Sequence, residues 1–185
     1  MLTNKKLGFI GGGNMTEALL KGLLASSSVG PKDILVSDLL SDRLEYLNKE
    51  YKIKTTDDSR KLVQKSDILI LAVKPQIVGK VLESFSDLVD SNKIIISVAA
   101  GISINFIEDI LNRKGKNKIS VIRTMPNTPA LVQEGATAIC GGGHSSKLDI
   151  KIAHHIFKAI GQTVAIEETH MDAVTGLSGS GPAYI

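Results

Sequence analysis

The stretch Lys6–Thr16, KLGFIGGGNMT, decides the fold of this chain. Its apolar first half has the length of a buried strand, and a helical pattern begins directly after three glycines. In such a strand–turn–helix, Gly11 permits the tight bend, Gly13 lets the backbone approach a pyrophosphate, and the helix N-terminus supplies N–H donors. Thr16 stands where this motif usually has Gly or Ala, so we expect slightly looser packing of the helix. The turn predicts a dinucleotide site, although a glycine triplet alone can also be only a flexible turn.

The rest of the sequence alternates between strand-length apolar runs and longer segments with helical spacing. The runs are rich in Leu, Ile and Val without strict alternation, which indicates strands buried on both faces, as in a parallel sheet. We expect strands at Lys6–Ile10, Ile34–Ser37, Ile68–Ala72, Lys93–Ser97, Ile119–Arg123, Ala136–Cys140 and Thr163–Ile166. We expect helices at Asn14–Ala25, Ser41–Glu50, Ser59–Lys65, Gln76–Phe85, Ile104–Asn112 and Leu148–Ile160. This order predicts an α/β fold with a doubly wound, mostly parallel Rossmann-type sheet.

Two side chains beyond the second strand bear on the choice of cofactor. A carboxylate at Asp38 can accept hydrogen bonds from ribose hydroxyls and repels a 2′-phosphate, which favours NADH. Arg43 is suited instead to binding the 2′-phosphate of NADPH. The other possible role for Asp38, capping the next helix, suits Ser41 better. The residues by themselves leave both cofactors open.

Three loops follow strands at the edge where an open α/β sheet binds ligands. They are Ala72-Val73-Lys74-Pro75, Ala99-Ala100-Gly101 and Arg123–Pro129. Their small residues allow close approach of a planar ring, while Lys74 and Asn127 can donate hydrogen bonds. We expect these loops to meet the nicotinamide, although a lysine at a strand end is more often only a solvated charge.

Composition and charge are those of an ordinary globular protein. Of 185 residues, 43% are apolar and 22% charged, and the net charge is +3. So small a surplus suits an anionic ligand and does not indicate a nucleic-acid partner. Cys140 is the only cysteine, which excludes an intrachain disulfide and favours a reducing, cytoplasmic location. We expect no membrane span, because no apolar run approaches about 20 residues. We also expect no metal site, because the histidines lack partners at ligand spacing.

The pattern changes near residue 167. Residues 1–166 are expected to form the NAD(P)-binding domain, and residues 167–185 the truncated start of an all-helical domain. His170–Leu177 has the pattern of a short helix. Gly179–Tyr184 introduces a second helix, with Pro182 suited to its first turn. Because the chain ends at Ile185, we expect that helix to be cut short.

Five segments together resemble the pyrroline-5-carboxylate reductase family over essentially the whole chain. They are Gly8–Met15, Ala72–Pro75, Ser97–Gly101, Arg123–Ala130 and Gly176–Tyr184. The first is shared with many dehydrogenases, whereas the last two, in this order, are specific. The resemblance implies an oxidoreductase that reduces the cyclic imine 1-pyrroline-5-carboxylate to L-proline, the last step of proline biosynthesis. Hydride would come from NAD(P)H, with NADPH the more frequent cofactor of the family.

The resemblance also implies a set of site residues. The pyrophosphate would be held by Ile10, Gly11, Gly12, Gly13, Asn14 and Met15, and the adjoining ribose by Ala72, Val73, Lys74 and Pro75. Ala99, Ala100 and Gly101 would lie beside the nicotinamide, Ser59 near the adenosine, and Asn127 and Thr128 near the imine. Family members form homo-oligomers through C-terminal helices that also bind the substrate carboxylate. Those helices are missing here, so the catalytic residues stay unknown.

Two alternatives remain open on the residues. A β-hydroxyacid dehydrogenase shares the fold and a similar glycine turn, but it needs a catalytic lysine on the helix after the first domain. No lysine follows Glu167 in this sequence. The other alternative is a dinucleotide-binding module that, in this truncated form, has no activity.

Overall fold

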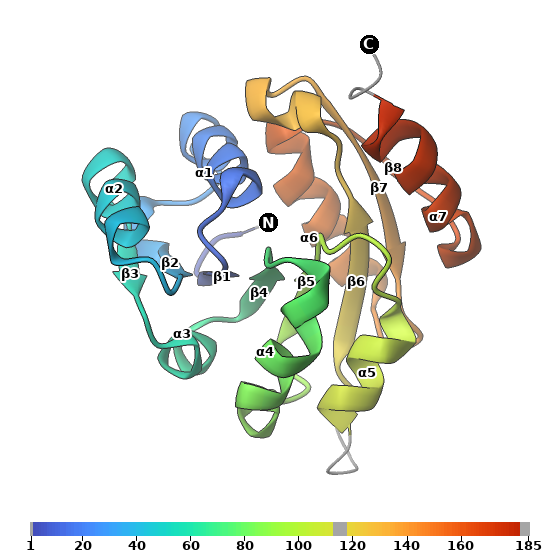
Figure 1. The fold of residues 1–185 in the computed structure, drawn as a ribbon, viewed down its shortest axis with the longest axis horizontal. Helices are drawn as coiled ribbons and strands as arrows, with labels where there is room; N and C mark the ends of the chain where they lie inside the picture. The colour runs from blue at the N-terminus through green and yellow to red at the C-terminus, as the bar shows by residue number, and fades with distance from the viewer. Residues whose placement is uncertain (1, 113–117, 182–185) are drawn as a thin grey trace.

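A single sheet of eight strands carries the fold, with helices on both of its faces (Figure 1). The computed structural model describes residues 2–112 and 118–181. Across the sheet the strands follow the order β3-β2-β1-β4-β5-β6-β7-β8. Their bounds are β1 Leu7–Ile10, β2 Ile34–Ser37, β3 Lys54–Thr56, β4 Ile68–Leu71, β5 Ile94–Ser97, β6 Ser120–Met125, β7 Gly135–Gly141 and β8 Gly161–Ala165. The first six strands of this order define a doubly wound sheet, which confirms the predicted fold.

The direction of the strands changes once. Strands β1 to β6 are parallel, whereas β7 runs antiparallel to β6 and β8 runs parallel to β7. The sheet reverses its order between β1 and β4, because the chain winds outward in one direction to β3 and then returns to the centre. Ligands of doubly wound sheets bind at this switch point, beyond the carboxyl ends of the strands.

The helices form two layers. They are α1 Asn14–Ala25, α2 Ser41–Tyr51, α3 Ser59–Lys65, α4 Val78–Phe85, α5 Ile104–Asn112, α6 Lys147–Phe157 and α7 Met171–Val174. Helices α1 and α2 lie on the opposite face from α3 and α4 (Figure 1). The sequence of strand β4, ILIL, is apolar throughout because both faces of the strand are buried. Ile68 and Ile70 belong to one apolar cluster, and Leu69 and Leu71 belong to the other.

Several element boundaries differ from those predicted. Strand β3 was not predicted, and α4 is preceded by a 3₁₀ turn at Pro75–Ile77. Helix α6 gives way to a 3₁₀ turn at Lys158–Ile160, and β8 starts at Gly161. Ser41 does not cap α2: the N-cap is Leu40, whose own side chain makes no capping hydrogen bond.

The segment after β8 contains three short, consecutive helical pieces between Glu168 and Gly179. A 3₁₀ turn at Glu168–His170 leads into the short helix α7, and a π-helical turn follows at Thr175–Gly179. Met171 is fully buried in the same apolar cluster as α5. The predicted second helix falls mostly on residues 182–184, which lie outside the described residues. The start of the segment therefore packs on the sheet domain, and the predicted boundary at residue 167 stays a prediction.

Candidate dinucleotide site

Strand register brings the sequence-predicted loops to one edge of the sheet. Ile10, the last residue of β1, pairs with Ser37 at the end of β2 and with Leu71 at the end of β4. Leu71 in turn pairs with Ser97, the last residue of β5, and Ser97 pairs with Arg123 on β6. The loops after β1, β2, β4 and β5 therefore start at the same level beside the switch point.

The glycine turn is tight because Gly11 adopts a conformation that other residues avoid. Its φ is +100°, and its N–H donates to the carbonyl of Ser37 over 2.8 Å. A Cβ at this position would lie 2.5 Å from the carbonyl oxygen of Ala72. Gly11 thus brings the first turn against the loop after β4, which agrees with the tight bend expected there.

Gly13 leaves space in front of α1. It is the N-cap of this 12-residue helix, and no described atom lies within 4 Å of the place a Cβ would take. Thr16 is fully buried, and its hydroxyl donates to the Gly11 carbonyl over 2.6 Å. The side chain of Thr16 thus ties the helix to the turn, and the slightly looser packing expected from it stays a prediction. Asn14 and Met15 form the first turn of α1.

Asp38 is bonded to the turn as well. One carboxylate oxygen accepts the Gly12 N–H over 2.7 Å, and the other accepts the Leu40 N–H over 3.0 Å. A carboxylate has about four acceptor positions, so Asp38 retains capacity for ribose hydroxyls. Its place at the end of β2 is the one that reads the adenosine ribose in doubly wound folds.

A pocket of about 350 Å³ opens at the ends of β1, β2 and β4. Its lining brings together the predicted residues Ile10, Gly11, Asp38, Ser59 and Val73, together with Ser37, Leu39, Leu40, Asp57, Ile77 and Val81. Leu39 is 90% exposed and Leu40 67% exposed, although both are large and apolar. An apolar rim beside a carboxylate suits the flat face of an aromatic ring.

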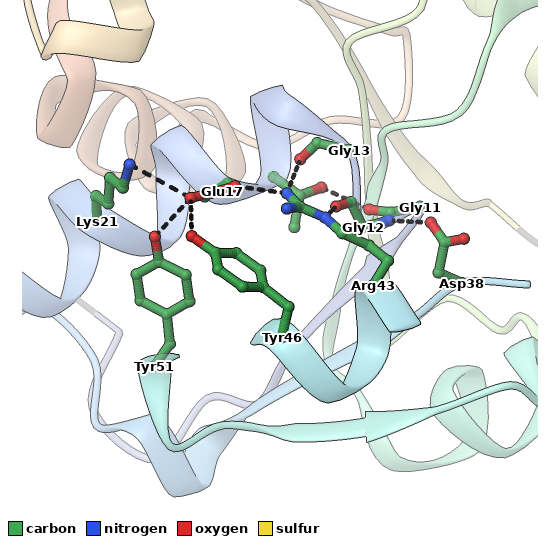
Figure 2. Close-up of polar contacts among 10 residues, drawn as sticks. Gly11, Gly12, Gly13, Glu17, Lys21, Asp38, Arg43, Tyr46 and Tyr51 are labelled. Atoms are coloured by element: carbon green, nitrogen blue, oxygen red, sulfur yellow. Dashed lines mark hydrogen bonds and ion pairs between the residues drawn. The ribbon is translucent and has the colours of Figure 1, made fainter. Parts of the chain in front are cut away.

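Arg43 does not line this pocket. Its guanidinium donates to the Gly12 carbonyl, to the Gly13 carbonyl over 3.4 Å and to Glu17 over 2.6 Å (Figure 2). Arg43 lines instead a neighbouring hollow of about 430 Å³, together with Leu40, Ser41, Asp42 and Tyr46. The two residues predicted to read the 2′ position therefore both contact Gly12, but they line different hollows, which share Leu40.

The carboxylate of Glu17, on α1, is surrounded by four side-chain donors. Besides Arg43, it accepts the hydroxyls of Tyr46 over 3.0 Å and Tyr51 over 2.8 Å, and Lys21 lies 3.3 Å away (Figure 2). Burial by itself raises the pKa of the Glu17 carboxyl. The bonds from Arg43, Tyr51, Tyr46 and Lys21 outweigh it and lower the pKa to about 2. Burial and the bond to Glu17 raise the pKa of Tyr51.

The loops after β4 and β5 present backbone and small side chains. Ala72 donates its N–H to the Ile10 carbonyl over 2.8 Å, and the Lys74 side chain is exposed. Pro75 opens the 3₁₀ turn before α4. Ala99 is buried, Ala100 is half-buried, and Gly101 has a φ of +72° with no described atom near its missing Cβ. Such a surface admits a planar ring.

Asn127 connects three parts of the chain. Its side-chain oxygen accepts the Ala136 N–H over 2.9 Å, and its nitrogen donates to the Ser178 hydroxyl over 3.2 Å. The amide thus joins the loop after β6 both to β7 and to the segment after α7. Thr128 is exposed at the start of a 3₁₀ turn.

Sequence reasoning missed two parts of the site. Leu39 and Leu40 line the pocket, and their signal was present as an apolar pair between a strand and a helix. Glu17 gave no comparable signal, because its partners Arg43, Tyr46 and Tyr51 come from a helix that the sequence does not place beside α1.

Other features bear on what the chain can bind. Cys140 is buried, and burial raises the pKa of its thiol. Within residues 2–112 and 118–181 there is no group of three or more His, Cys, Asp or Glu that could hold a metal ion. In the same part of the chain, every helix is too short or too polar to cross a membrane.

Fold and site together define the class. A glycine turn at the switch point, free space at the N-terminus of α1 and a carboxylate at the end of β2 match a nicotinamide-dinucleotide domain. The family model described as "NADP oxidoreductase coenzyme F420-dependent" matches residues 6–101. The chain is therefore an oxidoreductase domain of the Rossmann class.

Individual relatives identify the family more specifically than this family model does. The chain is 42% identical over 184 residues to a pyrroline-5-carboxylate reductase of Methanosarcina acetivorans, covering 100% of this chain and 67% of that protein. A solved pyrroline-5-carboxylate reductase from Coxiella burnetii superposes with a TM-score of 0.90 at 34% identity, over 97% of this chain and 66% of the other. The Plasmodium falciparum enzyme, solved with NADP bound, gives 0.85 at 31% identity, over 98% and 64%. This chain belongs to the pyrroline-5-carboxylate reductase family, and it spans about two thirds of the length of these relatives.

Proposed function

We propose that this chain is the dinucleotide-binding part of an enzyme that reduces 1-pyrroline-5-carboxylate to L-proline with NAD(P)H. The observation that carries the proposal is the Gly11 turn, which packs on the Ala72 loop at the switch point of a family member's sheet. The relatives do not favour the β-hydroxyacid dehydrogenase alternative.

The chemistry divides between cofactor and protein. When bound, the reduced nicotinamide supplies a hydride to the carbon of the substrate's C=N bond, while the ring nitrogen gains a proton from solvent or an acid. The role of this chain is to bind and orient the cofactor. The N–H groups at the start of α1 would bind the pyrophosphate, for which Gly13 leaves room. The small loop Ala99–Gly101 lets the ring lie close to the sheet edge.

The proposed contacts follow the family assignment. Ile10–Met15 would hold the pyrophosphate, Ala72–Pro75 the adjoining ribose, and Ala99–Gly101 the nicotinamide. Ser59 and Asp38 share one pocket, which supports an adenosine position there. Thr128 is exposed and free to approach the imine, whereas Asn127 would act by holding its loop, since both ends of its amide are already bonded.

For the cofactor we propose NADPH, with NADH also used. Arg43 and the hollow beside it offer a place for a 2′-phosphate, and a relative binds NADP. Asp38 opposes this choice through like-charge repulsion. The experiment is Asp38→Ser beside Arg43→Ala: the first is expected to raise NADPH affinity relative to NADH, and the second to lower it. Unchanged ratios in both variants would mean that neither residue reads the 2′ position.

Assembly and location are also proposals. We propose a homo-oligomer formed through the helices that the relatives have beyond the part matched here, and a cytoplasmic location. The second is supported by the single buried cysteine, which suits a reducing compartment.

The test of the function uses the enzyme with its family-length C-terminal part. Mixed with pyrroline-5-carboxylate and NADPH, it is expected to consume the reduced cofactor and form proline in equal amounts. Calorimetry of the 185-residue chain with NADPH, without substrate, tests cofactor binding separately. Binding without turnover by the longer protein would favour a silent dinucleotide-binding module instead.

A further inference from the structure

Arg43 and Asp38 both border Gly12, but the Arg43 guanidinium is bonded to the glycine turn and to α1. A Cβ on Gly12 would lie 3.3 Å from a carboxylate oxygen of Asp38 and 3.5 Å from Cγ of Arg43. The stem of Arg43 and the carboxylate of Asp38 therefore both border Gly12, at the end of β2 where a ribose 2′ group would lie. The guanidinium, however, runs along the backbone of Gly12 and Gly13 to α1.

Glu17 is the group that holds the guanidinium there. The Arg43–Glu17 ion pair is 2.6 Å long, and the exposed fractions of the two side chains are 23% and 15%. A pair so short and so little exposed is stronger than an ordinary surface ion pair. Arg43 also lies over the Tyr46 ring, 5.2 Å from its centre, which favours the same orientation.

The carboxylate of Glu17 is held in place by other partners, so it would not move together with Arg43. The two tyrosine hydroxyls and Lys21 hold it on the α1–α2 interface, and it stays ionised because of these bonds (Figure 2). A phosphate entering the hollow lined by Leu40, Asp42 and Arg43 would meet a guanidinium whose charge is already partly neutralised by Glu17. NADH carries no such phosphate, so its binding does not depend on the charge of Arg43 in this way.

We propose that Glu17 is a positioning residue for cofactor choice: by holding Arg43 against the glycine turn, it limits the preference for NADPH over NADH. This inference rests on the proposed dinucleotide function. It differs from the direct roles of Asp38 and Arg43, because Glu17 acts only through Arg43. Glu17 neutralises part of the charge of the guanidinium and fixes its orientation, so removing the Glu17 charge leaves more of the Arg43 charge for a 2′-phosphate.

The test measures the dissociation constants of NADPH and NADH by calorimetry for the 185-residue chain and its variants. Glu17→Gln keeps the shape of the side chain and removes its charge. It is expected to strengthen NADPH binding relative to NADH by about fivefold or more, a typical size for such coupling. Any general gain from losing a negative charge near the pyrophosphate affects both cofactors and cancels in the ratio.

Controls separate this effect from others. Glu45→Gln makes the same charge change at an exposed position of α2 and should leave the ratio unchanged. Adding Arg43→Met to Glu17→Gln should abolish the gain. Tyr46→Phe removes one donor to Glu17 with no change of charge, so a smaller shift in the same direction tests the proposal even if Glu17→Gln unfolds.

The outcomes are distinguishable. Binding of both cofactors with an unaltered ratio in Glu17→Gln, or in Tyr46→Phe if the first variant does not fold, overturns this inference and leaves the proposed function intact. A gain that persists without Arg43 overturns it too. Binding of neither cofactor by the folded wild-type chain overturns both proposals.

Discussion

At the scale of single residues, two glycines of the turn, Gly11 and Gly13, have different physical roles. Gly11 is required by the backbone, because its φ is +100° and a Cβ would meet the Ala72 carbonyl. Gly13 has a φ of −69°, which any residue can adopt, and open space before it. One glycine therefore serves the fold and the other serves the ligand.

Substitutions at the two positions should separate stability from binding. Gly11→Ala is expected to lower the free energy of unfolding by about 1–3 kcal/mol, through positive φ and backbone overlap. Gly13→Val is expected to leave stability nearly unchanged but to weaken dinucleotide binding at least about tenfold, or about 1.4 kcal/mol. Urea denaturation and calorimetry measure the two effects. Unaltered affinity in a folded Gly13→Val chain would place the pyrophosphate elsewhere.

Glu17 should also make stability depend on pH. Its folded pKa of about 2 is below the ordinary value of 4.5, so the folded state favours the ionised form. The stabilisation is complete above about pH 4.5 and is lost as the pH falls toward 2. The stability difference between wild type and Glu17→Gln is thus expected to shrink over that interval. Urea midpoints measured at several pH values test this, and a constant difference would contradict it.

At the scale of elements, helices were easier to predict than their caps and short strands. The apolar spacing predicted α1, α3 and α5 with the bounds that the structure has. Strand β3, Lys54-Thr55-Thr56, has no apolar residue and pairs only with β2 at the sheet edge, so it left no pattern to detect. The pairing of Arg43 with Glu17 depends on how α1 packs against α2, which local sequence does not specify.

Capping provides a matched test at this scale. The Ser146 hydroxyl accepts the Asp149 N–H over 3.1 Å, and the Asp149 carboxylate accepts the Ser146 N–H over 2.8 Å. Ser146→Ala is expected to cost about 1 kcal/mol of unfolding free energy. Ser41→Ala, at the start of a helix whose N-cap is Leu40, should change it by less than about 0.5 kcal/mol. Equal losses in the two variants would show that Ser41 caps α2 after all.

At the scale of the whole molecule, the segment after β8 is joined to the sheet by charge and by packing. Arg123, 6% exposed on β6, donates to Glu168 over 3.2 Å and to Asp172 over 2.9 Å. Glu168 also accepts the N–H of Ile104 at the start of α5 over 2.8 Å. These bonds, with buried Met171, fix the direction in which the chain leaves the dinucleotide domain.

This arrangement leads to a prediction about the 185 residues themselves. The cofactor-binding groups proposed above all lie within the described sheet domain, so the chain is expected to bind NADPH. The relatives are about half as long again as this chain. We expect the substrate carboxylate to bind to the part of the family-length protein that lies outside the match. Without those groups the imine is not held against the nicotinamide, and proximity alone accounts for many orders of magnitude in rate. Assays with pyrroline-5-carboxylate should therefore show cofactor binding but no proline, whereas the family-length protein should turn over. Proline formation above background by the 185-residue chain would contradict this, and would require the substrate site to lie among the loops after β4, β5 and β6.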